Sequence, residues 1–360
     1  MKKATGHMGF AEMAVAHRKR SNLFLERVQE LLNWTELERV IARYDTRGKA
    51  IAGNTAYPGL VLFKMSLLGI WYKLRDRALE ERVNDSLSFT RFVGLSLSDS
   101  VPDHSVISRF RTLLTHTGGW DALLQSVNDQ IRTHGLLLHT GTLIDASITQ
   151  SPRKPQGKPL YEVEDTASSE APVEGEKGIT GHRGYAPRVD TEASWTKKAG
   201  KCYWGYKKHH ATDLNGMILA VETTPAHVHD NKAFEALVDR ANPPTGSRCY
   251  ADKGYVGSQR NSYLKAKQLK NGIQQKAVRN RALTARQKQR NKLISKVRYA
   301  VERTFGGQKR WFGAGSTRYL GLAATHTQHV WEAICYNLKR APQLYLNQLA
   351  KKALEAELCL

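Results

Sequence analysis

Hydrophobic residues recur at three- and four-residue steps through most of the first 135 positions, which is the period of amphipathic helices. Pro58 suits the first turn of a strongly apolar helix, and Thr35 followed by Glu38 has the spacing of a capping box. The pattern predicts an all-α N-terminal region, with two helices in residues 21–44 and others in 58–74, 86–93, 106–114 and 120–134.

Two of these predicted helices flank a loop that contains Pro102-Asp103-His104-Ser105, a run with an N-cap signal. The second of them carries Arg109 and Arg111. A short helix, a turn and a second capped helix fit a helix-turn-helix DNA reader, and the alternative is a plain helical bundle. Both interpretations stay open for this region.

After residue 136 the pattern changes to short apolar runs that end in an acid, which is typical of strands. Asp145 closes the run 136–145, and Asp252 closes the run 248–252. Ala146 and Ser147 follow the first acid, and Gly254 stands two residues after the second. Side chains at the ends of strands emerge from a sheet into a crevice, so both carboxylates are candidates for a site.

Between the two acids an Asn-Gly pair, Asn215-Gly216, predicts a tight turn that joins strands 204–210 and 217–224. A helix from Asp230, its expected N-cap, to about Arg240 follows. The order is strand, hairpin, helix, strand, with the first acid on the first strand. This order favours an α/β fold, a ribonuclease-H-like mixed sheet flanked by helices and preceded by the all-α region.

The segment 253–310 is crowded with Lys and Arg, seventeen in all, and contains one acid, Glu302. Apolar residues in helical spacing predict a helix over 280–303 that ends at Gly306-Gly307. A lone carboxylate here is either a surface ion pair with Arg298 or Arg303, or a metal ligand beside a bound polyanion. Two further helices, 325–338 and 343–358, are expected on either side of Pro342.

The net charge of the chain is +22 and its pI is about 9.9, so a polyanionic partner is expected and nucleic acid is the first candidate. A basic membrane-surface protein is the competing class. The longest apolar run, Leu60–Trp71, contains Lys64 and is too short to span a bilayer. Four scattered cysteines without CxxC spacing, and no secretion signal, favour a reducing cytoplasm.

Two strand-end aspartates and one helix glutamate can form a cage for two divalent ions. Mg²⁺ prefers a few carboxylates together with substrate phosphates and water, and Mn²⁺ can substitute for it. Two such ions stabilise both the attacking and the leaving oxygen of an in-line phosphoryl displacement. The candidate catalytic and metal-binding residues are therefore Asp145, Asp252 and Glu302.

Three blocks around these acids, residues 143–147, 250–255 and 298–306, resemble the acidic blocks of bacterial insertion-sequence DDE transposases. The resemblance is to the IS-five type within the wider IS-four superfamily. In the third block of that superfamily Arg298, Glu302 and Lys309 match the expected spacing, whereas Ser295 stands where a tyrosine is expected. The three blocks occur in the expected order across most of the chain.

The resemblance implies a transposase that binds insertion-sequence ends, cuts at the transposon 3′ ends and joins them to target DNA by two-metal phosphoryl transfer. Its partner is double-stranded DNA, both terminal inverted repeats and target, and two ends require at least a homodimer. It acts in the bacterial cytoplasm, at the nucleoid. The expected DNA-binding residues are Lys208, His227, His229, Lys253, Arg298, Lys309, Arg109 and Arg111. A metal-dependent nuclease without strand transfer and a non-catalytic DNA-binding derivative are the alternatives.

The predicted organisation is a flexible basic N-terminus at 1–20, a helical DNA-binding and dimerisation domain at 21–135, a catalytic domain at 136–345 and a C-terminal tail at 346–360. An irregular insert is expected at about 150–191. It includes sixteen residues, 161–176, with six acids and no Lys or Arg. This stretch fits a solvated linker, or a DNA mimic that shields a basic groove.

Overall fold

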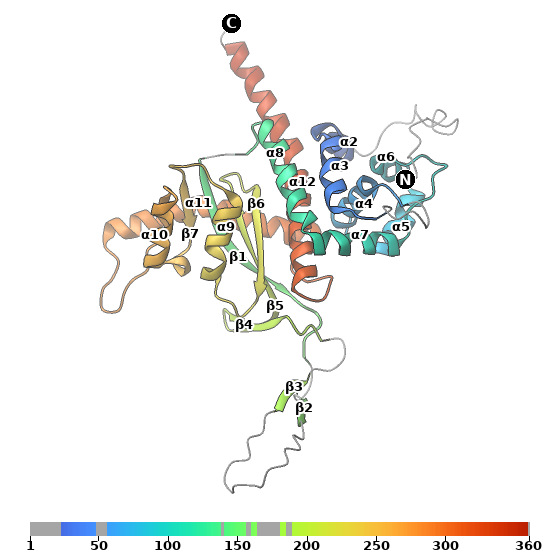
Figure 1. The fold of residues 1–360 in the computed structure, drawn as a ribbon. Coiled ribbons are helices and arrows are strands. Elements are labelled where there is room, and N and C mark those ends of the chain that lie inside the picture. Colours follow the sequence, from blue (N-terminus) through green and yellow to red (C-terminus); the bar gives the residue numbers. More distant parts are fainter. Residues whose placement is uncertain are drawn as a thin grey trace, which may run out of the picture.

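The computed structural model describes residues 23–47, 56–137, 140–155, 160–163, 181–184 and 189–358 (Figure 1). The predicted flexible N-terminus, most of the loop at 47–55 and most of the acidic stretch lie outside these residues.

The N-terminal part is helical, as predicted. Asn33, not Thr35, is the N-cap of its second helix, and its side chain accepts a hydrogen bond from the backbone N–H of Glu36. Pro58 stands just before the first turn of the next helix rather than inside it. The helices of this part are α2 (Leu23–Leu31), α3 (Trp34–Tyr44), α4 (Gly59–Trp71), α5 (Asp76–Asp85), α6 (Leu87–Val93), α7 (His104–Thr117) and α8 (Gly119–Thr133).

A mixed sheet forms the second part and has the strand order β6-β5-β1-β7-β8, with β4 beside the first half of β5. β1, β5 and β6 run antiparallel, and β7 and β8 run parallel to β1. This is the ribonuclease-H-like arrangement that the sequence predicts. The strands are β1 (Gly141–Gln150), β4 (Ser194–Lys198), β5 (Lys201–Thr212), β6 (Ile218–Pro225), β7 (Arg248–Ala251) and β8 (Lys270–Ile273).

Two short strands, β2 (Leu160–Val163) and β3 (Gly181–Gly184), pair with each other within the predicted insert. They lie well away from the main sheet in Figure 1.

Helices cover both faces of the sheet. The 3-10 turn η1 (Asp230–Ala233), α9 (Phe234–Ala241), the 3-10 turn η2 (Lys253–Tyr255) and α10 (Ser258–Ala266) share a hydrophobic cluster with Ile144 and Ala251 on one face. On the other face lie α11 (Ala285–Phe312) and α12 (Leu322–Leu358). His229, not Asp230, is the N-cap of η1.

α11 and α12 are both longer than predicted. α11 continues through Gly306-Gly307 and ends at Gly313, because Gly307 packs so closely on Tyr336 of α12 that a Cβ there would lie 2.9 Å from its ring. α12 is one helix of 37 residues that contains Pro342. Pro342 cannot donate a helix hydrogen bond, yet packing of α12 against α2 and α8 keeps the helix continuous.

The helical part and the sheet share one hydrophobic core, because α12 runs between them (Figure 1). Trp120 of α8 stacks on Trp331 of α12, with ring centroids 5.4 Å apart. Trp71 of α4 donates its indole N–H to the carbonyl of Cys335 at 3.0 Å. The division into domains at residues 135 and 136 stays a prediction.

Candidate active site

Asp145 and Asp252 lie side by side at the centre of the sheet. β1 and β7 are parallel, and Leu143 lies opposite Tyr250. Asp145 and Asp252 each follow these residues by two positions, so the same register places the two acids beside each other on one face of the sheet. Asp252 follows the last residue of β7, as predicted. Asp145 instead lies inside β1, because β1 continues to Gln150 in its pairing with β5.

Both carboxylate oxygens of Asp145 accept hydrogen bonds. Oδ1 accepts a hydrogen bond from the backbone N–H of Ala146, and Oδ2 accepts one from Nη2 of Arg298, each at 2.8 Å. Its side chain is 19% exposed. Burial raises the pKa of Asp145, the charge of Asp252 adds to that rise, and Arg298 opposes both. Arg298, or another cation in its place, therefore favours the ionised form of Asp145.

Asp252 keeps one oxygen free of hydrogen bonds from the described residues. Its Oδ1 accepts from the backbone N–H of Gly254 at 2.7 Å and caps η2. Tyr255, at the end of η2, is 1% exposed, and its hydroxyl has no hydrogen-bond partner in the described part of the chain. Burial, followed by the charges of Asp145, Asp230 and Asp252, raises the pKa of Tyr255 well above its usual range. Tyr255 was missed from sequence, although it stands only three residues after Asp252.

Glu302 lies one helical turn beyond Arg298 on α11 and is exposed. The ion-pair alternative does not hold, because Arg298 binds Asp145 and Arg303 donates to the carbonyl of Asn215. Among the described residues the Glu302 side chain forms no hydrogen bond or ion pair. Glu302 is thus unengaged next to the Asp145 contact.

The hairpin turn and the sheet together fix where α11 lies. Thr304 donates to the carbonyl of Gly216 at 2.8 Å, and a Cβ on Gly216 would lie 2.7 Å from the Thr304 hydroxyl. His210, which pairs with Asp145 across β1 and β5, is fully buried and stacks on Phe305 at 4.6 Å. Together with the Arg298–Asp145 ion pair, these contacts fix this part of α11 against the sheet.

Two neighbouring carboxylates, with one oxygen of Asp252 unoccupied, form the hard oxygen donor set that Mg²⁺ or Mn²⁺ takes. The buried hydroxyl of Tyr255 beside them is a further oxygen without a partner in the described structure. Within the described ranges, no three His, Cys, Asp or Glu side chains gather closely enough to hold a metal ion. The residues therefore fit a divalent ion at Asp145 and Asp252, while Glu302 is not in contact with that pair.

Three of the predicted DNA-binding cations are exposed: Lys253, Lys309 and Arg109. Lys253 directly follows Asp252, and Lys309 lies nearly two turns beyond Glu302 on α11. Burial, and then the charges of Lys208 and Lys198, lower the pKa of Lys309. Arg109 keeps a hydrogen bond to the Ser105 hydroxyl at 3.1 Å.

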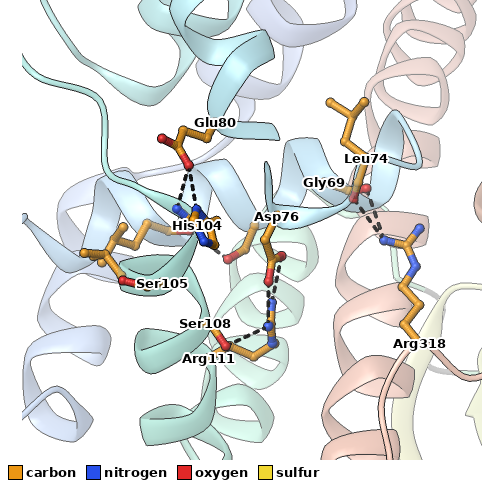
Figure 2. Close-up of polar contacts among 12 residues, drawn as sticks. Gly69, Leu74, Asp76, Glu80, His104, Ser105, Ser108, Arg111 and Arg318 are labelled. Atoms are coloured by element: carbon orange, nitrogen blue, oxygen red, sulfur yellow. Dashed lines mark hydrogen bonds and ion pairs between the residues drawn. The ribbon is translucent and has the colours of Figure 1, made fainter. Parts of the chain in front are cut away.

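Lys208 and Arg111 are buried, which corrects their prediction as DNA contacts. Lys208 forms a 2.7 Å ion pair with Glu332, and each side chain is 1% exposed. Arg111 holds Asp76 through both terminal nitrogens, at 3.1 and 2.8 Å (Figure 2). Its guanidinium also lies over the ring of Tyr319. Sequence position alone does not show that a cation on a strand or helix faces the core.

His227 and His229 are exposed and engaged in local structure. The backbone N–H of His227 donates to the Ser194 hydroxyl at 2.8 Å, and its Nδ1 lies 2.9 Å from the same oxygen. Nδ1 of His229 accepts a hydrogen bond from the backbone N–H of Asn231 at 3.3 Å. In both rings Nε2 is the nitrogen left for DNA, so their predicted role stays a prediction.

A family model described as a transposase DDE domain matches residues 137–338, the span that contains the whole main sheet, α11 and all three candidate acids. The chain belongs to this family of DDE transposases. A second family model, described as a transposase domain, matches residues 14–113 in the helical part. The transposase is thus an enzyme of DNA transposition, and membership of the family implies dependence on a divalent metal ion.

Among curated proteins, the transposase for insertion sequence element IS1106 from Neisseria meningitidis serogroup B is 34% identical over 235 residues. The match covers 65% of this chain and 76% of the relative. It confirms the likeness to bacterial insertion-sequence transposases, whereas the IS-five type stays a prediction.

Solved structures with some likeness include the piggyBac transposase synaptic complex with hairpin DNA, at a TM-score of 0.39 and 11% identity. That match covers 92% of this chain and 75% of the other. The Mos1 transposase paired-end complex with the left transposon end has a TM-score of 0.21 and 11% identity, and covers 94% and 93% of the two chains. At these TM-scores the likeness supports no conclusion about this transposase.

In the described part of the chain, no helix combines the length and apolarity needed to cross a bilayer.

Proposed function

We propose that this transposase cuts and joins DNA strands at a site formed by Asp145, Asp252 and Glu302, with Mg²⁺ as its natural ion and Mn²⁺ as a substitute. The observation that carries the proposal is the parallel register of β1 and β7, which makes two acids 107 positions apart into neighbours. The Arg298–Asp145 ion pair, one helical turn before Glu302 on α11, supports Glu302 as the third acid.

Each acid has a separate task in this proposal. Asp145 and Asp252 hold the ion from the sheet, with the free oxygen of Asp252 as the first donor. Glu302 is exposed and forms no hydrogen bond or ion pair with the described residues, so its side chain is free to change rotamer, and its proposed task is to turn toward an ion and complete the cage. Bound divalent ions supply a lowered pKa for the attacking water and charge stabilisation for the leaving 3′ oxygen.

The basic residues around the acids position the DNA. Lys253 next to Asp252, and Lys309 further along α11, are exposed and suited to phosphates on either side of the cut. Arg298 acts through Asp145: its guanidinium lowers the pKa of that buried carboxylate against the effect of burial, which favours the ionised form. In this proposal the exposed lysines bind the DNA phosphates, and the carboxylates bind the metal ion.

The same site is proposed to cut the 3′ ends of its own element and then to join those ends to a target. Two ends need two sites, so the active form is a homodimer or a larger assembly. The compartment is the bacterial cytoplasm, at the nucleoid. These points rest on membership of the family and on the curated relative.

A strand-joining assay tests this proposal. Purified transposase is incubated with pre-cut, labelled ends of its element and a supercoiled plasmid, with Mg²⁺ or with EDTA. The expected result is joined product with Mg²⁺ and none with EDTA. Metal-dependent cleavage without any joined product would point to the nuclease alternative, and binding without cleavage would point to the non-catalytic derivative.

A further inference from the structure

A basic cleft lies where the helical part meets the sheet, away from the acids. Its volume is about 550 Å³. Its walls come from the α4–α5 corner, the segment after β1 and the segment between α11 and α12, and Trp331 of α12 is also in its lining. Three segments that are distant in sequence thus converge on one hollow.

The charge of this cleft is strongly positive. Four exposed cations line it: Lys73, Arg75, Arg153 and Arg318. Its one acid, Asp76, is neutralised by Arg111 (Figure 2). Among the ion pairs of the described residues, none involves those four cations. A concave surface lined by charges of one sign is suited to a polyanion.

The walls of the cleft are held in place before any partner arrives. Arg318 donates to the carbonyls of Gly69 and Leu74, each at 3.4 Å, and so ties the α11–α12 segment to the end of α4 (Figure 2). An arginine has five N–H donors, so further donors of Arg318 remain for a ligand. The Asp76–Arg111 pair, covered by Tyr319, fixes the start of α5.

α11 connects the cleft to the acid pair. Nζ of Lys73, in the cleft, donates to the carbonyl of Arg310 at 3.3 Å, and Arg298 on the same helix binds Asp145. Twelve residues of α-helix separate Arg298 from Arg310, which is about 18 Å at 1.5 Å per residue. One turn of duplex DNA is about 34 Å long, so one duplex can reach both places.

We propose that this cleft binds the sugar–phosphate backbone of duplex DNA, less than one helical turn from the scissile phosphate. The inference rests on the proposed function, because the distance is measured from the proposed catalytic acids. The cleft contacts phosphates rather than base edges, since its charges without an ion pair are those of Lys and Arg, around a volume too small for a whole duplex. It sets the register of the DNA on the enzyme.

Binding to a labelled duplex from the element's end, measured at several salt concentrations, tests the proposal. The cleft variant is Arg75→Gln with Arg153→Gln. The matched control, Arg77→Gln with Lys265→Gln, loses two exposed charges outside the cleft. Two lost phosphate contacts make the slope of log K against log salt about 1.8 less steep and weaken binding on the order of tenfold, on unrelated duplexes as well.

A charge-retaining variant, Arg75→Lys with Arg153→Lys, is expected to keep the wild-type slope, and melting temperatures check that all variants fold. A photoreactive residue at position 153 is expected to cross-link to nucleotides within one turn of the cut. A cleft variant with the slope of the matched control, or cross-links only beyond one turn, overturns the proposal. Wild-type enzyme that neither cuts nor joins ends contradicts the proposed function instead, whatever the cleft binds.

Discussion

Nη2 of Arg298 lies 2.8 Å from Oδ2 of Asp145, and this contact joins α11 to the central strand of the sheet. The two residues are 153 positions apart. Because Glu302 follows Arg298 by one helical turn, the contact also sets how far the glutamate lies from the acid pair. The Arg–Glu spacing of four therefore ties two roles together: Arg298 anchors the helix to Asp145, and the proposed metal ligand Glu302 lies one turn further along it.

Removing any one of the three acids is expected to stop cleavage while DNA binding persists. Asp145→Asn, Asp252→Asn and Glu302→Gln each keep the side-chain shape and remove a negative ligand. Cleavage of a labelled end with Mg²⁺ should fall by at least about 10³-fold, a barrier increase of about 4 kcal/mol. Gel-shift affinity at the same salt is the control. Near-normal cleavage by one variant removes that residue from the cage.

Arg298→Gln is expected to move the acidic limb of the pH–rate profile to higher pH. Burial raises the pKa of Asp145 and Arg298 lowers it, so loss of the guanidinium raises that pKa further. Metal binding needs the ionised carboxylate. As the pH is lowered, the variant is therefore expected to lose activity at a higher pH than the wild type does. Arg303→Gln, on the same helix but bound to Asn215, is the control. Equal limbs in both variants would show that Arg298 does not act through Asp145.

Lys208→Met is expected to destabilise the fold rather than weaken DNA contacts directly. It leaves Glu332 buried and unpaired, at a cost of about 3–5 kcal/mol in the free energy of unfolding. Lys208→Met combined with Glu332→Leu should recover much of that loss, because both charges are then gone. Urea unfolding measures the effect. A single variant as stable as wild type would contradict the buried pair.

Arg109 and Arg111 are expected to respond in opposite ways, although they are two residues apart on α7. Arg111→Gln breaks the bidentate pair with Asp76 and should cost about 1–3 kcal/mol of stability. Arg109→Gln, at an exposed site, should change stability by less than about 0.5 kcal/mol and weaken DNA binding. Thermal melting and salt-dependent binding separate the two. Equal melting temperatures would mean that the Asp76 pair contributes nothing.

Sequence was sufficient for most of the framework. Apolar spacing predicted most of the helices before residue 135, and the Asn215-Gly216 turn with its two strands predicted the hairpin. The three acids could be picked out because they stand in unusual contexts: two at the ends of apolar runs, and one alone in a basic segment. These signals lie within short stretches of sequence, so they can be recognised without knowledge of the fold.

What could not be predicted depends on contacts between distant segments. α11 runs through Gly306-Gly307 because Tyr336 lies against it, and α12 runs through Pro342 because the core encloses it. Lys208 resembles any other lysine of a basic protein until Glu332, 124 positions later, is found beside it. The local secondary-structure propensity of a residue gives no information on such partners. Where propensity and tertiary packing favour different structures, packing decides the outcome.

The most direct test of the central claim is to map the metal with Fe²⁺ in place of Mg²⁺. Bound Fe²⁺ with ascorbate and peroxide cuts the polypeptide next to its ligands, without any need for turnover. In the presence of a cleaved end, cuts are expected near Asp145, Asp252 and Glu302 together, and excess Mg²⁺ should suppress all three. Cuts near the two aspartates with none near residue 302, or cuts elsewhere, would contradict a site shared by the three acids.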